Sequence, residues 1–126
     1  MKIVNLMPHS LVLYDPSDTR PAGPKGYVLI DKAAKPVCII PSSGISRAAC
    51  TETPVGTVTG IPVFRMTFGD PEGVPEPQQG VMYVVSSITA RACAEFGRTT
   101  DDLIMPARTV RDEEGRIIGC TAFSVL

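Results

Sequence analysis

Short runs of apolar residues, most of them followed closely by proline, glycine or aspartate, set the pattern of much of the chain. Runs of this length are typical of strands, because a globular helix needs about eight residues or more. The stretches 15–26 and 70–80 are rich in proline and glycine and are predicted to be loops. Strands are predicted at 3–6, 10–14, 27–30, 37–40 and 81–85, the last of them apolar enough to be covered on both faces.

Two segments carry the pattern of a hairpin. Residues 55–68 are predicted to form a hairpin that turns near 59–60, and within them residues 63–68 alternate between two unlike faces. Pro62 lacks a backbone N–H, which predicts that the second strand begins at, or lies on, a sheet edge. A second hairpin is predicted to join 109–111 to 116–124 through an acidic turn that contains glycine.

One segment, 88–96, has helical periodicity. Ser86 is a preferred residue for capping its start, and Gly97 is a natural stop at its end. A capped single turn is predicted at 99–103, ending before Pro106. The face of the helix predicted to point toward the core consists of Ile88, Ala92, Cys93 and Phe96.

These elements predict a mainly β protein of the α+β type. We expect a small, mostly antiparallel sheet or a half-closed barrel, with one short helix in the C-terminal third. The chain has 126 residues, which is the usual size of one domain, so a single domain spanning 1–126 is predicted.

The charge and the composition of the chain argue against two classes of partner, nucleic acids and membranes. Twelve basic and thirteen acidic residues leave a net charge of −1, which is unlike a general nucleic-acid binder. No apolar run approaches the length of a membrane span, and the N-terminus lacks the apolar stretch of a signal peptide. These features predict a cytoplasmic protein that has no membrane contact.

The cysteines and the single histidine do not predict a metal site. Cys38, Cys50, Cys93 and Cys120 contain no closely spaced pair, whereas zinc ligands usually come in such pairs. We expect buried cysteines in the thiol form, and no metal.

No recognised catalytic or cofactor motif is present. The chain has neither a G-x-G-x-x-G segment nor a Walker A sequence, so no cofactor is expected. Arginines outnumber lysines eight to four, and their planar guanidinium groups suit phosphate or carboxylate. The N-terminus of a helix also favours anions. The candidate ligand-binding residues are His9, Arg47, Arg65, Ser86, Ser87, Arg91, Asp102 and Arg111.

Each of these residues also has a purely structural interpretation. A histidine after proline is commonly a turn residue, and exposed arginines commonly pair with surface acids. A serine before a helix commonly does no more than cap it.

Several segments, taken in order, carry a resemblance to a known family: Asn5-Leu6-Met7-Pro8-His9, Ile40-Pro41-Ser42-Ser43-Gly44, Gly60-Ile61-Pro62-Val63, Tyr83-Val84-Val85-Ser86, Asp101-Asp102-Leu103 and Val110-Arg111-Asp112-Glu113. Together they resemble the small phage and prophage proteins that open with N-L-T-P-H and continue with Y-I-V-S and V-R-D-E-x-G segments. Met7 stands where that family usually has threonine. The resemblance implies a viral context, hence a host-cell cytoplasm, and no catalytic assignment.

The function expected from these observations is that of a phage-type accessory protein. It would sequester a small anionic ligand, such as a nucleotide-derived host immune signal, and so oppose host defence without catalysis. The first alternative is a phage structural or protein-interaction module that pairs an edge strand with its partner. The second is a metal-free hydrolase that uses His9 with a serine or cysteine. Association into a homo-oligomer is left open.

Overall fold

The computed structural model describes residues 1–24 and 26–126. Within them the chain is mainly β with one short α-helix, as the sequence predicted. The elements in chain order are β1 (Lys2–Asn5), β2 (Leu11–Leu13), the 3-10 helix η1 (Pro16–Asp18), β3 (Thr19–Pro21), β4 (Tyr27–Leu29), β5 (Cys38–Ile40), β6 (Cys50–Val58), β7 (Ile61–Phe68), β8 (Val81–Val84), α1 (Ser87–Glu95), β9 (Leu103–Arg111) and β10 (Ile117–Ser124).

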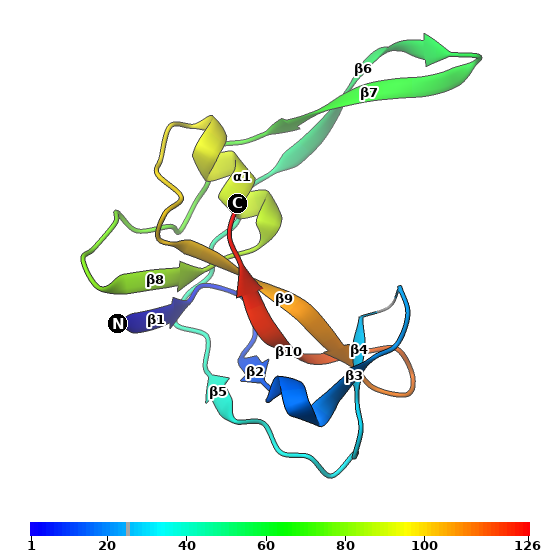
Figure 1. Cartoon of the computed structure of the whole chain (residues 1–126). Coiled ribbons are helices and arrows are strands. Elements are labelled where there is room, and N and C mark those ends of the chain that lie inside the picture. The colour runs from blue at the N-terminus through cyan, green and yellow to red at the C-terminus, as the bar shows by residue number, and fades with distance from the viewer. Residues whose placement is uncertain (25) are drawn as a thin grey trace.

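Eight of these strands form one curved sheet (Figure 1). Its main row runs β1-β8-β9-β10-β2-β5, and β4 adds to β9 with β3 beside it. The two ends of the row meet where Asn5 of β1 forms a bridge to Ser42, just beyond β5. The sheet is therefore a nearly closed barrel, which confirms the predicted half-closed barrel.

The pairing of the strands is mixed, which corrects the prediction of a mostly antiparallel sheet. β8 runs parallel to both β1 and β9, and two further pairs, β4–β9 and β2–β10, are also parallel. Parallel neighbours need a crossover connection, and α1 is the crossover between β8 and β9. The sequence showed the strand and the helix of this unit, but of its second strand it showed only the end, at 109–111.

One prediction of irregular structure was wrong in part, and the predicted turn at 99–103 is confirmed except for its last residue. Part of the predicted loop 15–26 is regular, because η1 leads into β3, which pairs antiparallel with β4. The predicted turn at 99–103 ends in a strand, since β9 begins at Leu103 and continues through Pro106. Pro106 is tolerated inside β9, where it lies opposite Phe123 of β10.

The core lies on both faces of β8 and β9, which confirms that the 81–85 segment is covered on both sides. On one face, Tyr83 and Val85 pack with Leu103 and with the helix residues Ala90 and Cys93. On the other face a second cluster is formed by Val84, Leu11 and Ile104. Val84 and Val85 are completely buried.

Helix α1 buries Ala92 and Cys93 as predicted, but not Ile88 and Phe96. Ser86 caps its start and Phe96 its end, close to the expected limits. The buried residues are Thr89, Ala90, Ala92 and Cys93, whereas Ile88 is 42% and Phe96 53% exposed. Among the described residues no helix is long and apolar enough to cross a membrane.

The strands β6 and β7 form a separate two-stranded sheet, which we call the arm (residues 50–68). Figure 1 shows the arm projecting away from the barrel. Its turn lies at Thr59 and Gly60, as predicted, and both residues have positive φ, at 52° and 77°. Such a pair is typical of the tight turns that match the twist of a hairpin.

Candidate functional site

The eight candidate ligand-binding residues are not gathered at one site. Ser86, Ser87 and Arg91 lie at the start and in the first turns of α1, and Arg65 lies on the arm. His9 and Arg111 line two different cavities. Arg47 and Asp102 are each held in an ion pair. The fold does not bring all eight residues together in a single anion pocket.

The N-terminus of α1 is a capped helix start. The Ser86 hydroxyl accepts a hydrogen bond from the Thr89 backbone N–H at 3.2 Å and donates to the Thr89 hydroxyl at 3.0 Å. Ser87 and Arg91 are exposed on the first turns. The cap satisfies one of the free N–H groups to which an anion would bind, so the capping interpretation explains Ser86 fully.

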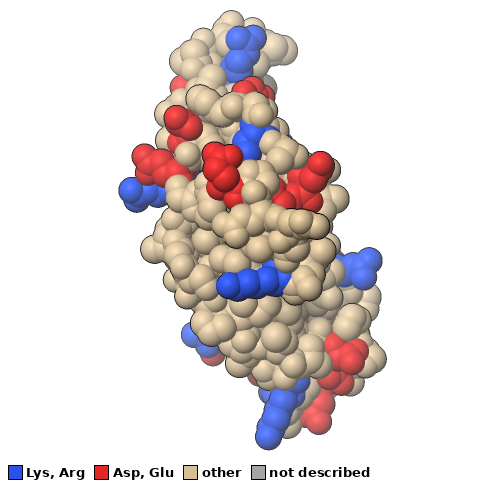
Figure 2. All heavy atoms as spheres, turned by 90° about the vertical axis from the view of Figure 1, so that its left-hand side faces the viewer, with Lys and Arg blue, Asp and Glu red and all other residues tan. Residues whose placement is uncertain are grey.

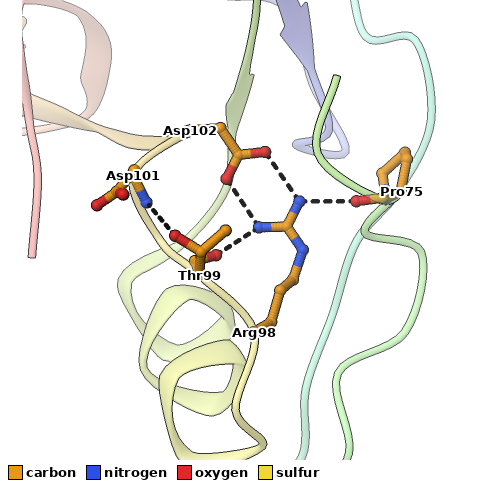
Figure 3. A network of polar contacts seen from close by, with 5 residues as sticks. All are labelled: Pro75, Arg98, Thr99, Asp101 and Asp102. Atoms are coloured by element: carbon orange, nitrogen blue, oxygen red, sulfur yellow. Dashed lines mark hydrogen bonds and ion pairs between the residues drawn. The ribbon is translucent and has the colours of Figure 1, made fainter. Parts of the chain in front are cut away.

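Asp102 belongs to a polar network that is largely buried (Figure 3). Arg98 donates from Nη1 and Nη2 to the two carboxylate oxygens of Asp102, at 2.8 and 2.9 Å. The same two nitrogens donate to the carbonyl oxygens of Thr99 and Pro75, each at 2.7 Å. This network fastens the loop 70–80 to the chain that follows α1.

Arg98 is a key residue that the sequence reasoning missed. Its hydrogen bonds to Asp102 raise the pKa of the guanidinium, against the opposing effect of burial. Its Nε is buried with no hydrogen-bond partner among the described residues. The spacing of four residues between Arg98 and Asp102, directly after Gly97, was the signal that could have found the pair.

His9 lines a small cavity of about 110 Å³ together with Ser10, Thr109 and Cys120. Its Nδ1 lies 3.0 Å from the Ser10 carbonyl oxygen, as expected of a turn histidine. Burial raises the pKa of the Cys120 thiol, so at neutral pH this sulfur is protonated and a poor nucleophile. The cavity therefore gives little support to the hydrolase alternative with Cys120 as its nucleophile.

Arg111 lines a larger groove of about 500 Å³ between β4 and the β9–β10 turn. Arg20 and Lys32 add two more cations, whereas Asp112, Glu113 and Glu114 add three carboxylates. Lys32 pairs with Glu113, and Arg111 donates to the Gly115 carbonyl at 2.7 Å. The apolar residues that line it are Val28, Leu29, Ile30 and Ile118. The charges in this groove are balanced.

Charge is dispersed on the face of the molecule that Figure 2 shows. In the view of Figure 2, basic and acidic side chains are interspersed among uncharged atoms, and no continuous basic patch forms on that face. Within the described residues no group of three histidine, cysteine or acidic side chains could hold a metal ion. Of the four cysteines, Cys93 and Cys120 are buried, Cys50 is partly buried and Cys38 is exposed, so the predicted burial applies to two of them.

The arm has the largest concentration of exposed apolar side chains. Because residues paired in antiparallel strands point to the same side, Pro54, Phe64 and Met66 share one face with Glu52. The opposite face carries Thr53 with Arg65 near the base of the arm, and aliphatic side chains near the turn. The exposed large apolar residues of the arm are Val55, Val58, Ile61, Val63, Phe64 and Met66, with relative exposures of 38 to 67%.

Comparison with known proteins adds no relative to this picture. No family model matches the chain, and no curated protein or solved structure matches it.

Proposed function

We propose that this chain is a protein-interaction module and that the arm is its binding element. The observation that carries the proposal is the exposure of six large apolar side chains on a ribbon that projects from the barrel. Apolar groups gathered on a projecting element, rather than scattered singly, are typical of surfaces that bind another protein.

The energetics of the arm support this proposal. A two-stranded hairpin on its own is at best marginally stable in water. The arm pairs with no other strand of the described chain, and it contacts the body mainly where β7 meets α1. Burying apolar surface contributes about 25 cal/mol per Å², so a partner that covers the arm would also stabilise it.

The chemistry of the arm favours a protein over a nucleic acid as the partner. Its charged residues are Glu52 and Arg65, which cancel. Binding to a phosphate backbone depends on a surplus of lysine and arginine, which the arm does not have. The resemblance to small phage proteins is compatible with such a module.

A photo-crosslinking amino acid placed at position 64 tests the proposal. Benzoylphenylalanine replaces Phe64 with little change in shape, and the same residue at Ile39, an exposed apolar position on β5 of the barrel, is the matched control. We expect one discrete crosslinked protein from position 64 in cells that express the chain, and much less from position 39. A smear or no product from position 64, in a variant that folds normally, would refute the proposal.

Sequestration of a small anionic ligand is a second candidate function, and the groove around Arg111 is the observation that favours it. Three cations line this groove, and its three carboxylates are already held in ion pairs with Lys32 and Arg116, which reduces their repulsion of an anionic ligand. Calorimetric titration with ADP-ribose and with a cyclic dinucleotide tests it. We expect heat at micromolar concentrations that is lost in Arg20→Gln, and no heat from either compound would rule it out.

A further inference from the structure

We infer that the groove around Arg111 takes a small molecule that joins one singly charged oxyanion to a flat or compact apolar body, and that Arg20 binds the oxyanion. This inference rests on the second candidate function, binding of a small anionic ligand at this groove, and specifies the charge and the shape of that ligand. It follows from the register of three strands, from the partners of the charged groups and from the apolar residues of the groove.

The register of three strands places two arginines on the same side of the sheet, with a valine between them. β3, β4 and β9 lie side by side (Figure 1), and Val28 is aligned with Arg20 on one neighbour and with Arg111 on the other. Aligned residues of neighbouring strands point to the same side, and strands lie about 4.8 Å apart, so the Cα atoms of the two arginines are about 10 Å apart. All three residues line the groove. Two guanidinium groups therefore flank an apolar side chain within it.

Arg20 is the cation that is available to a ligand. Its side chain makes no hydrogen bond or ion pair with any other described residue. Arg111, in contrast, is held by its bond to the β9–β10 turn, and Lys32 is held by Glu113. Opposite charges on adjacent strands stabilise a sheet when they face each other, but Arg20 faces Val28. Nothing in the described part of the chain accounts for a cation at position 20.

The charges around the groove leave room for one negative charge. Glu113 is paired with Lys32. Asp112 and Glu114 are both paired with Arg116, which is not itself a lining residue. Arg116 thus adds a fourth cation to the three that line the groove, against three carboxylates, and one positive charge is in surplus. A ligand with one negative charge neutralises this surplus, whereas a second charge would meet the carboxylates.

The choice of oxyanion follows from the shape of the guanidinium group. Carboxylates and phosphodiesters each carry a single charge at neutral pH, and both match the planar fork of donors that arginine presents. The shared chemistry is therefore a singly charged oxyanion, and the two sources are separated by experiment.

The apolar lining residues favour an apolar body on the ligand. The Ile30 side chain is 63% exposed, so a ligand that covers it removes apolar surface from water. The groove has a volume of about 500 Å³, which lies in the range of sites for small molecules, about 300–1,000 Å³. Such sites combine apolar side chains with a few polar groups that fix the orientation of the ligand. Here Val28, Ile30 and Ile118 are positioned to contact the body while Arg20 holds the oxyanion.

NMR titration of the ¹⁵N-labelled full-length chain with 2-naphthoate, which joins one carboxylate to a flat apolar body, tests the inference. We expect a dissociation constant of about 1 mM or below, as for a good ligand of this size. The largest shifts should fall on the backbone amides of residues 20, 28–30 and 118. Methyl 2-naphthyl phosphate replaces the carboxylate with a phosphodiester, and the tighter of the two anions identifies the oxyanion that the groove prefers.

Two further compounds separate the charge from the apolar body. 2-Naphthalenemethanol has the same body without the charge and should bind about tenfold more weakly, since the hydrogen bond to a charged group is lost. Acetate has the charge without the body and should cause no shifts at the same concentration.

Arg20→Gln should weaken binding of 2-naphthoate by about tenfold or more, because it removes the cation and leaves a side chain of similar reach. Arg108→Gln is the matched control. Arg108 is an exposed arginine on β9 that does not line the groove, so this variant should bind as the wild type does. The NMR spectrum shows directly whether each variant is folded. Should Arg20→Gln fail to fold, the map of shifts in the wild-type chain provides the second measurement.

Three results would overturn the inference: no shifts from either anion, shifts confined to residues outside the groove, or equal binding of 2-naphthoate and the alcohol. Equal loss of affinity in Arg20→Gln and Arg108→Gln would do the same. If both anions fail while ADP-ribose or the cyclic dinucleotide gives heat that Arg20→Gln abolishes, the second candidate function stands and only the ligand assigned here is wrong. If none of these compounds binds, both are removed.

Discussion

Asn5 shows how a single buried side chain closes the barrel. Its amide donates to the carbonyl oxygens of His9 at 2.9 Å and of Ile40 at 3.1 Å, and its Oδ1 accepts from the Met7 backbone N–H at 2.9 Å. These bonds fix the turn after β1 and tie it to the end of β5. The Asn-Leu-Met-Pro-His segment thus has a structural role. The Met7 side chain packs against the second core cluster, and its backbone makes the polar contact.

The ion pair of Arg98 with Asp102 is expected to matter more than any surface pair. Its side chains are only 15% and 12% exposed, so removing Arg98 leaves a carboxylate without its cation in a partly dry site. We expect Arg98→Ala to lower the free energy of unfolding by about 2–4 kcal/mol, as measured by urea denaturation.

Arg47→Ala is the matched control for this change. Arg47 is paired with Glu72 at 3.1 Å, but the side chains are 79% and 68% exposed, and such pairs contribute about 1 kcal/mol or less. Equal losses in the two variants would contradict the structural importance assigned to Arg98.

The buried cysteines should differ sharply from Cys38 in reactivity. Burial raises the pKa of the Cys93 and Cys120 thiols, whereas Cys38 is exposed. Because the thiolate is the reactive form, iodoacetamide at pH 8 should modify Cys38 first and leave Cys93 and Cys120 unmodified until the protein unfolds. Mass spectrometry of the digested protein measures the order.

The same raised pKa values predict a direction for stability. In the folded state the two thiols keep their protons to higher pH than in the unfolded chain, whose thiols ionise near pH 9. The free energy of unfolding that the protonated thiols contribute is therefore fully present below about pH 8. It is lost as the pH rises through 9 and above. If iodoacetamide modified Cys120 as fast as Cys38 in the native protein, Cys120 would not be buried as described.

At the scale of elements, the sequence predicted what local patterns control. The turn of the arm, the capped start of α1 and the turn before β10 follow from residues close together in the chain. The strand β3 and the first half of β9 were missed, because Pro21 and Pro106 are strand breakers by propensity and only pairing with β4 and β10 makes them strand residues. Local propensity cannot show such tertiary support.

Gly73 is expected to be required for the loop 70–80 to reach the body of the protein. The loop bridges to the segment before β6, where the backbones of Arg47 and Glu72 exchange hydrogen bonds of 2.8 and 2.9 Å. Gly73 has a φ of 79°, and a Cβ there would overlap the Ile45 carbonyl. We expect Gly73→Ala to lower the melting temperature by about 8 °C or more.

The lower melting temperature expected of Gly73→Ala has two causes, backbone strain and overlap with the Ile45 carbonyl, and Gly80→Ala separates them. Gly80 has nearly the same φ, 76°, but a Cβ there meets nothing within 4 Å. This variant should show only the backbone strain, of about 1 kcal/mol. If the two variants have the same melting temperature, the close approach to the Ile45 carbonyl does not contribute to the loss of stability.

At the scale of the whole molecule, the sequence could not show which distant segments meet. The parallel pairing of β1 with β8 and the closure between Asn5 and Ser42 join parts of the chain whose local patterns carry no information about each other. The prediction of the candidate site failed for the same reason. Residue chemistry proposed Arg47, Arg65 and Arg111 as one anion site, but the topology places them in different parts of the structure. The exposure of the arm became visible only in three dimensions.

Removing the arm should leave the barrel folded. Neither core cluster contains a residue of the arm, and Cys50 and Phe68 at its base are register partners. Their Cα atoms are thus about 5 Å apart, a gap that a Gly-Gly link in place of residues 51–67 spans as a tight turn. The shortened chain should keep the mainly β circular dichroism spectrum and a cooperative unfolding transition.

We expect the melting temperatures of the shortened and the full-length chain, measured at the same protein concentration, to agree within a few degrees, because the arm adds surface rather than core. A loss of about 10 °C or more in the shortened chain would instead make the arm part of the folding unit.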